Sequence, residues 1–228
     1  MITRYGIGNF IILIIIGLLS LTGAYFLINF WVLSILFALI GIYIIFIAFW
    51  FFRDPERKIP EEALNDKRII LSPADGTIME IVDDFEPNYF QEKTKRISIF
   101  LSPMDVHVNR IPATGVIEYF KFTQGRKLIA SKSEASAQNQ QTLFGLHNHY
   151  GKVLFKQIVG ILARRLVWDI KVGDNVTIGE RFGMMKFGSR MDIHLPVNSE
   201  IITQVGDKVV AANTILAKLP EQISKYEN

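Results

Sequence analysis

The chain has 228 residues, of which 50% are hydrophobic and only 21% are charged, and its mean hydropathy is +0.26. This balance excludes intrinsic disorder and is more apolar than that of an ordinary soluble domain. The net charge of +3 is too small to indicate a nucleic-acid-binding surface, and the absence of cysteine excludes disulfides, thiolate nucleophiles and cysteine-ligated zinc.

The first feature along the chain is a run of 48 residues, from Tyr5 to Phe52, without a charged side chain. A helix of that length would measure about 72 Å, more than twice the roughly 30 Å of a bilayer's hydrocarbon core. The run therefore predicts two membrane-spanning helices, near residues 8–27 and 31–51, joined around Gly23–Asn29. It is too long for a signal peptide and has no small-residue cleavage site.

Basic residues flank this run on both sides. Arg4 precedes it and a basic cluster at 53–58 follows it. By the positive-inside rule, both ends of the hairpin lie on the cytoplasmic side. We therefore expect residues 1–52 to form a membrane anchor and residues 53–228 to form one domain, large enough to be catalytic. The anchor would hold this domain at the cell membrane, facing the cytoplasm.

After Asp54-Pro55 the sequence changes to short alternating runs separated by turn residues. β-Branched and aromatic residues dominate the runs, while Gly, Pro, Asn and Asp dominate the intervals. We expect a compact, mainly β domain (α+β at most), in which Gln157–Trp168 is ambiguous between strand and helix. The expected strands cover residues 68–71, 77–82, 97–101, 116–122, 152–159, 167–172, 182–187, 191–195, 200–205 and 214–219.

Short internal repeats accompany these runs. Pro73–Ile78, Pro112–Ile117 and Pro196–Ile201 share a turn followed by the start of a strand, and Val172–Val176 matches Val205–Val209. The Gly-Asp pairs of the last two segments indicate tight turns, because glycine readily adopts positive φ. The pattern resembles the half-motifs of biotinyl/lipoyl-type barrel-sandwich domains. No carrier lysine stands at a matching hairpin tip, so a swinging-arm role is not expected.

The Gly188-Ser189 pair lies between two of the strand-like runs. The hydroxyl of such a serine can attack the preceding carbonyl, turning the amide into an ester, when the backbone is strained and a base is near. β-Elimination then cuts the chain and leaves a dehydroalanine, which hydrolyses to an N-terminal pyruvoyl group. By itself the pair proves little, because most Gly-Ser pairs are turns.

Several motifs surround this pair in one order. They are Leu71-Ser-Pro-Ala-Asp-Gly-Thr77, Phe100-Leu-Ser-Pro-Met-Asp-Val-His-Val-Asn-Arg-Ile-Pro112, Ala163-Arg-Arg165, Gly179-Glu-Arg-Phe-Gly183 and Lys186-Phe-Gly-Ser-Arg190. Over residues 53–219 the chain thus resembles the phosphatidylserine decarboxylase proenzymes, in the short form of bacteria and archaea. The resemblance implies self-cleavage between Gly188 and Ser189 into a β chain (1–188) and an α chain (189–228).

The resemblance also implies the activity, which is the conversion of phosphatidylserine to phosphatidylethanolamine and CO₂ in phospholipid biosynthesis. The implied cofactor is the pyruvoyl group made from Ser189, which forms a Schiff base with the substrate amine and accepts the electrons released with CO₂. The implied partners are the membrane lipid and the two cleaved chains as a heterodimer, with further oligomerisation left open; no metal is expected. Two alternatives stay open: a decarboxylase of a related serine-headgroup lipid such as archaetidylserine, and a non-catalytic membrane-tethered adaptor of lipoyl-like fold.

Two further residues take catalytic roles by this resemblance. Asp75 corresponds to the family's triad carboxylate, although its plainer interpretation is a turn aspartate. His107 is the expected base for processing, the acid–base group for decarboxylation, or both, against the interpretation of a structural histidine. Where the long form has a second histidine, this chain has Arg110, which cannot act as a base near neutral pH. The simplest hypothesis gives both tasks to His107.

Three arginines are candidates for binding a substrate phosphate or carboxylate: Arg110, Arg165 and Arg190. Arg190 occupies a position where the long forms carry a small hydroxyl residue, and it is equally well interpreted as a charged strand residue. His194 is expected on a strand surface, on the same face as Asp192.

Overall fold

The computed structural model describes residues 1–125, 138–160, 165–185 and 189–221. The chain divides into two compact units, Met1–Glu56 and Arg57–Asn228, and each is described here by itself.

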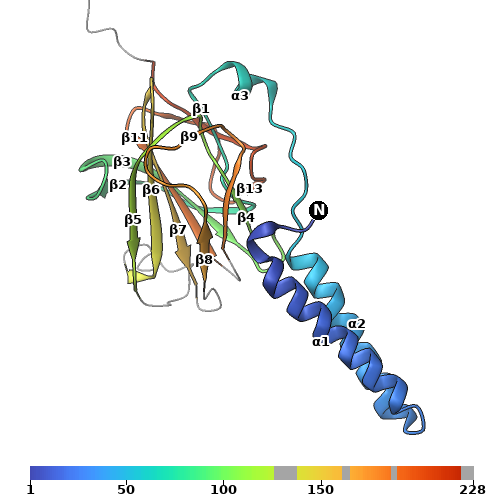
Figure 1. Cartoon of the computed structure of the whole chain (residues 1–228). Helices are drawn as coiled ribbons and strands as arrows, with labels where there is room; N and C mark the ends of the chain where they lie inside the picture. Colours follow the sequence, from blue (N-terminus) through green and yellow to red (C-terminus); the bar gives the residue numbers. More distant parts are fainter. Residues whose placement is uncertain (126–137, 161–164, 186–188, 222–228) are drawn as a thin grey trace, which may run out of the picture. The chain divides into compact units, whose positions relative to one another are not determined.

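The first unit is a helical hairpin (Figure 1). Both long helices are apolar and long enough to cross a membrane. Small residues bring their backbones together, since a Cβ atom added to Gly41 would lie 2.8 Å from the Gly17 carbonyl oxygen. The Ser20 hydroxyl donates across the hairpin to the Phe37 carbonyl at 2.7 Å. The helices are η1 (Arg4–Gly6, a 3₁₀ turn), α1 (Ile7–Phe26) and α2 (Trp31–Phe51).

The second unit is mainly β, which confirms the predicted fold class. Its described residues contain one short helix, α3 (Glu61–Asn65), and strands that form three sheets (Figure 1). The strands are β1 (Ile69–Leu71), β2 (Gly76–Glu86), β3 (Glu92–Leu101), β4 (Val108–Arg110), β5 (Gly115–Thr123), β6 (Gln141–Asn148), β7 (Gly151–Val159), β8 (Leu166–Trp168), β9 (Asn175–Val176), β10 (Arg181–Met185), β11 (Ser189–Pro196), β12 (Glu200–Ile201), β13 (Lys208–Val209) and β14 (Ile215–Lys218).

The largest sheet has the strand order β13-β2-β3-β11-β7-β6-β5-β9, and all of its neighbouring strands are antiparallel. The internal repeat explains this order. Gly76 and Gly115 begin β2 and β5, which pair at the two ends of the sheet with β13 and β9. Those two short strands follow the repeated Gly-Asp turns, in which Gly173 and Gly206 have φ of +93° and +98°. The repeated motifs therefore build equivalent ends of one sheet.

The hydrophobic core lies on one face of this sheet and against the smaller sheets β4-β10-β8 and β1-β14-β12. Met191, Ile193 and Leu195 of the central strand β11 belong to the core together with Phe144 and Phe155. Because side chains alternate along a strand, the even-numbered residues of β11 occupy the opposite, outer face. The core thus fixes which side chains of β11 face inward, and Ser189 has the same parity as the core residues.

The structure changes several predicted boundaries. β8 ends at Trp168 rather than at position 172, a few residues before the turn that contains Gly173. β12 ends at Ile201 rather than at position 205, likewise before the turn that contains Gly206. The ambiguous segment 157–168 is strand at both of its described ends, in β7 and β8, and its residues 161–164 lie outside the described part of the chain.

Candidate functional site

Ser189 is the first residue of β11, the central strand of the large sheet. It lies opposite Leu101 of β3 and Val159 of β7. Its side chain is fully buried, and its hydroxyl oxygen has no hydrogen-bond partner among the described residues. Gly188, the other half of the predicted cleavage site, lies outside the described residues. A buried, unengaged hydroxyl is unusual for a structural serine, because burial without a hydrogen bond carries a free-energy cost.

His107 lies just before β4, and its ring is fully buried. Its Nδ1 is 2.8 Å from the backbone carbonyl oxygen of Asp105. A carbonyl oxygen can only accept a hydrogen bond, so Nδ1 carries the hydrogen and the neutral ring has its lone pair on Nε2. That tautomer is the one that a general base requires.

Strand pairing brings His107 and Ser189 to the same end of the domain. The His107 carbonyl accepts a hydrogen bond from the backbone N–H of Met185 at 3.2 Å. Ser189 follows Met185 by four residues, and four residues of extended chain span at most about 14 Å. His107, the predicted base, therefore contacts the residue that precedes the short β10–β11 connection, and Ser189, the predicted nucleophile, follows that connection.

Asp75 lies in the turn that leads into β2, and the described contacts of its carboxylate are with other groups than His107. Its Oδ2 is 2.6 Å from Nη2 of Arg57, and its Oδ1 accepts a hydrogen bond from the backbone N–H of Ala211 at 2.8 Å. The same turn contacts β4, since Arg110 N donates to the Pro73 carbonyl at 2.9 Å. In this state the Asp105 carbonyl, rather than Asp75, orients the histidine ring.

The three candidate substrate arginines have different surroundings. Arg110 is buried on β4, and its Nη1 donates to the Gly179 carbonyl at 3.1 Å. Arg165 is exposed and directly precedes β8. Arg190 is fully buried on the outer face of the large sheet, where protein groups already engage its guanidinium.

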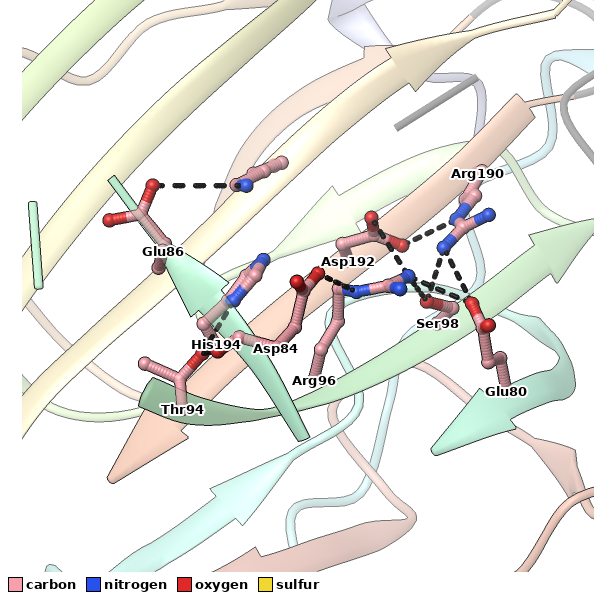
Figure 2. Close-up of polar contacts among 10 residues, drawn as sticks. Glu80, Asp84, Glu86, Thr94, Arg96, Ser98, Arg190, Asp192 and His194 are labelled. Atoms are coloured by element: carbon pink, nitrogen blue, oxygen red, sulfur yellow. Dashed lines mark hydrogen bonds and ion pairs between the residues drawn. The ribbon is translucent and has the colours of Figure 1, made fainter. Parts of the chain in front are cut away.

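Figure 2 shows the buried polar cluster to which Arg190 belongs. Its Nε donates to Oδ1 of Asp192 at 2.6 Å, and its Nη2 donates to Ser98 Oγ at 2.7 Å and to Glu80 at 3.1 Å. Arg96 binds the same Glu80 and Ser98, each at 2.9 Å. Burial acts to lower the pKa of Arg96, but the neighbouring carboxylates, Asp192 foremost, outweigh it and raise that pKa. These contacts favour the strand-residue interpretation of Arg190 over phosphate binding.

His194 shares the outer face with Asp192, as predicted, but the prediction of a surface position is wrong because the ring is only 1% exposed. Thr94 Oγ1 donates to the Asp84 carbonyl at 3.0 Å and lies 2.9 Å from His194 Nδ1. Since that hydroxyl has one hydrogen, which it gives to Asp84, Nδ1 of His194 donates to it. Burial, followed by the nearby charge of Lys156, lowers the pKa of His194 to about 3.

Two buried amide side chains, those of Gln157 and Asn109, were not among the site residues predicted from the sequence. Gln157 Nε2 donates to Asn109 Oδ1 at 2.9 Å and to the Val167 carbonyl at 3.4 Å, while Gln157 Oε1 accepts from Thr142 Oγ1 at 2.8 Å. The carbonyl and the hydroxyl fix the orientation of Gln157, and Gln157 in turn fixes that of Asn109. Nδ2 of Asn109 is then a buried donor that no described residue accepts.

The register places Gln157, which contacts Asn109, close to Ser189. Gln157 lies opposite Met191, and Ser189 lies opposite Val159 on the same pair of strands, so Ser189 and Gln157 are diagonal neighbours roughly 7–8 Å apart. Asn109 contacts Gln157 and follows His107 by two residues. The alternation in Val-His-Val-Asn could have predicted that Asn109 and His107 share a face.

The sequence is similar to that of known proteins over most of its length. The sequence profile of the family described as phosphatidylserine decarboxylase matches residues 45–217. Three curated relatives carry the name phosphatidylserine decarboxylase proenzyme. The protein of Salinibacter ruber is 48% identical over 75% of this chain and 75% of its own length. That of Carboxydothermus hydrogenoformans is 41% identical over 91% and 92%, and that of Chlorobium phaeobacteroides is 38% identical over 95% and 98%.

Proposed function

The chain belongs to the phosphatidylserine decarboxylase family, and we propose that it is a self-processing, pyruvoyl-dependent enzyme that converts phosphatidylserine to phosphatidylethanolamine and CO₂. The structural observation that supports this most is the place of Ser189, a buried and unengaged hydroxyl at the start of the central strand. The names of the relatives do not favour the archaetidylserine or adaptor alternatives.

The surroundings of Ser189 fit a pyruvoyl group at that position. The side chain is fully buried, and its hydroxyl oxygen has no described partner. Asn109, which contacts the diagonal neighbour Gln157, supplies a buried Nδ2 donor that no described residue accepts. When present, the group supplies an electron sink for decarboxylation. The residues around it supply binding, orientation and proton transfer.

For self-cleavage we assign the base to His107. Its Nε2 lone pair takes the proton of the Ser189 hydroxyl while Oγ bonds to the Gly188 carbonyl carbon, and that proton passes to the amide nitrogen as the C–N bond breaks. Loss of the Ser189 α-proton then expels the Gly188 carboxylate, leaving a dehydroalanine that water converts to the pyruvoyl group and ammonia. Asp75 remains a proposed contributor, since its turn is hydrogen-bonded to β4 next to His107.

For the substrate we assign Arg165 and Arg110 rather than Arg190. Arg165 is exposed and free to meet a phosphate at the domain surface, whereas Arg110 is buried beside the segment that carries His107. Arg190 is engaged by Asp192, so a phosphate would have to displace an existing ion pair.

The helical hairpin and the cleavage position determine the proposed setting. α1 and α2 would anchor the enzyme in the membrane that contains its lipid substrate, with Arg4 and the cluster at 53–58 on the cytoplasmic side. Cleavage would leave a heterodimer of residues 1–188 and 189–228, in which the smaller chain begins with β11.

Intact-mass spectrometry of the chain expressed in membranes tests this proposal. The expected result is a fragment that begins at residue 189 with a blocked N-terminus of pyruvoyl mass, together with conversion of phosphatidylserine to phosphatidylethanolamine. The variant Ser189→Ala should stay at full length and form no phosphatidylethanolamine. An uncut wild-type chain, or a fragment beginning with an ordinary serine, would refute self-processing.

A further inference from the structure

A cavity of about 370 Å³ lies on the outer face of the large sheet. The β2–β3 hairpin and the strands β5, β6 and β7 surround it. Its polar lining consists mainly of Asp84, Asn88, Arg96, Lys121, Gln141 and Lys156. The odd-numbered residues of β7 face the core, as Ser189 of β11 does, so Lys156 lies on the opposite face of the sheet. The cavity therefore opens on the face opposite to that of Ser189. It is therefore separate from the proposed catalytic site.

Two lysines face this cavity from the same rung of the sheet. Lys121 of β5 lies opposite Leu143 of β6, and Leu143 lies opposite Lys156 of β7. Strands in a sheet are about 4.8 Å apart, so the two lysine backbones are roughly 10 Å apart with Leu143 between them. Their long side chains can bring both ammonium groups to one ligand above Leu143.

Among the described residues, Lys156 has no close acceptor for its ammonium group. Its side chain is 9% exposed, and its closest ion-pair contact is with Glu86 Oε1 at 3.9 Å. Glu86 already accepts hydrogen bonds from the backbone N–H groups of Asn88, Tyr89 and Phe90 and from the Asn88 amide. Burial lowers the pKa of Lys156 despite the nearby carboxylates. The ammonium is thus a buried charge that the protein compensates incompletely.

The other polar groups of the cavity lining narrow the chemistry of the ligand that would fit. Lys121 donates to the Asn88 side-chain oxygen at 2.8 Å and has no carboxylate within ion-pair distance in the described part of the chain. Gln141 is 7% exposed, and its Oε1 has no described partner. Arg96, in contrast, is occupied by Asp84 and Glu80 (Figure 2). The cavity therefore offers two lysine ammonium groups and the Gln141 Oε1 acceptor, beside an Asp84 carboxylate that Arg96 engages.

We propose that this cavity binds a phosphate group, held between Lys121 and Lys156. Phosphate oxygens satisfy both ammonium groups, and the P–OH of a hydrogen phosphate can donate to Gln141 Oε1. A phosphodiester has no such hydroxyl, so free phosphate and phosphate monoesters are the chemistry that the lining fits. A free anion and the headgroup of a phosphatidic-acid-type lipid both present it.

Titration calorimetry of inorganic phosphate into the full chain, in neutral detergent at constant ionic strength, tests the proposal. The wild type should bind phosphate saturably. Lys156→Met should weaken binding at least about ten-fold, because it removes a charged hydrogen bond, and Lys121→Met should also weaken it. Lys208→Met removes the same charge from an exposed position on β13 and should have no effect. A second arm with phosphatidic acid or phosphatidylcholine in the micelles distinguishes a lipid source from a soluble one.

Two controls separate this site from folding and from catalysis. In phosphate-free buffer Lys156→Met should be at least as heat-stable as the wild type, since it removes a buried charge, and Lys156→Gln serves as the second variant if it is not. Ser189→Ala should bind phosphate as the wild type does, so failure of self-processing would leave this result unaffected. Absence of saturable phosphate binding, or equal affinity in the wild type and both Lys156 variants, would overturn the proposal.

Discussion

The hydrogen bond to the Asp105 carbonyl decides what the ring of His107 can do. It fixes the hydrogen on Nδ1 and leaves Nε2 as a base inside a fully buried site. His107→Ala should therefore slow self-cleavage by at least about 100-fold, the usual contribution of a positioned base. The uncut fraction on denaturing gels, followed over time, measures this. His149→Ala, on the exposed turn after β6, is the control. Complete cleavage of the His107 variant at the wild-type rate would remove it from the mechanism.

Asn109 contributes a donor whose removal can be separated from packing. Asn109→Asp keeps an oxygen for Gln157 Nε2 but replaces the free Nδ2 donor with an acceptor. If that donor stabilises the negative charge that develops on the Gly188 carbonyl oxygen, the variant should cleave about 100-fold more slowly while remaining folded. Cleavage kinetics and thermal unfolding of the same preparation test both parts. Wild-type kinetics would restrict Asn109 to a structural role.

His194 makes the domain sensitive to acid. The folded pKa of about 3 lies below the ordinary value of 6.5, so between these values the unfolded chain binds a proton that the folded chain excludes. Above pH 6.5 the free energy of unfolding should therefore keep its maximum value. Below pH 6.5 it should fall by about 1.4 kcal/mol per pH unit, which amounts to about 2 kcal/mol between pH 7.5 and pH 5. His194→Asn keeps a donor for Thr94 and should lose that share of the slope. Urea unfolding of both proteins at several pH values measures the difference, and identical slopes would contradict it.

The sequence predicted where these residues lie along the chain, but not what surrounds them. The motif around His107 identified the histidine, yet its orienting group is a backbone carbonyl, which no residue pattern reveals. His194 was expected at the surface because its strand alternates, but the Thr94 side of the β2–β3 hairpin covers it. Burial of this kind depends on a neighbouring strand that is distant in sequence.

At the scale of secondary structure, alternation predicted most of the long strands and failed for β6 and for the short strands β4, β9 and β13. β4 has only three residues and stands close to a proline, so it is too short to show a period. β6 contains Gly145 in its middle, and glycine is depleted in strands. Gly145 is needed because a Cβ there would lie 2.8 Å from the Tyr89 ring. Tertiary packing therefore overrides local preference in this strand.

The polar cluster on the outer face ties β11 to β2 and β3, and its strength can be measured. Arg190→Met would leave Asp192, which is fully buried, without its closest ion-pair contact, and should lower the free energy of unfolding by about 3 kcal/mol. The double variant Arg190→Met/Asp192→Leu should recover most of that loss, because it removes both charges.

Denaturant unfolding of the uncleaved Ser189→Ala background measures these values without interference from processing. Arg68→Met, which breaks a partly exposed pair with Asp66, is the matched control and should cost no more than about 1 kcal/mol. A double variant as unstable as the single one would show that Arg190 acts through Glu80 and Ser98 instead.

At the scale of the whole catalytic unit, cleavage before Ser189 would cut the chain at the entrance to its central strand. All eight residues of β11 lie opposite β3, and six of them also lie opposite β7. β14, from the same fragment, pairs with β1 from the other one. The two fragments thus share one hydrophobic core rather than meeting at a surface.

We therefore expect the cleaved chains to stay together. Met191, Ile193 and Leu195 would all have to leave the core for the small fragment to dissociate, and each fully buried side chain of this size contributes about 1.5–3 kcal/mol. Size-exclusion chromatography of processed enzyme in mild detergent should yield both fragments in one peak at equal amounts, and only sodium dodecyl sulfate or concentrated urea should separate them. Elution of the 189–228 fragment alone in mild detergent would contradict the shared core. β11 lies between β3 and β7, so it cannot leave an intact sheet while it is paired with both of them.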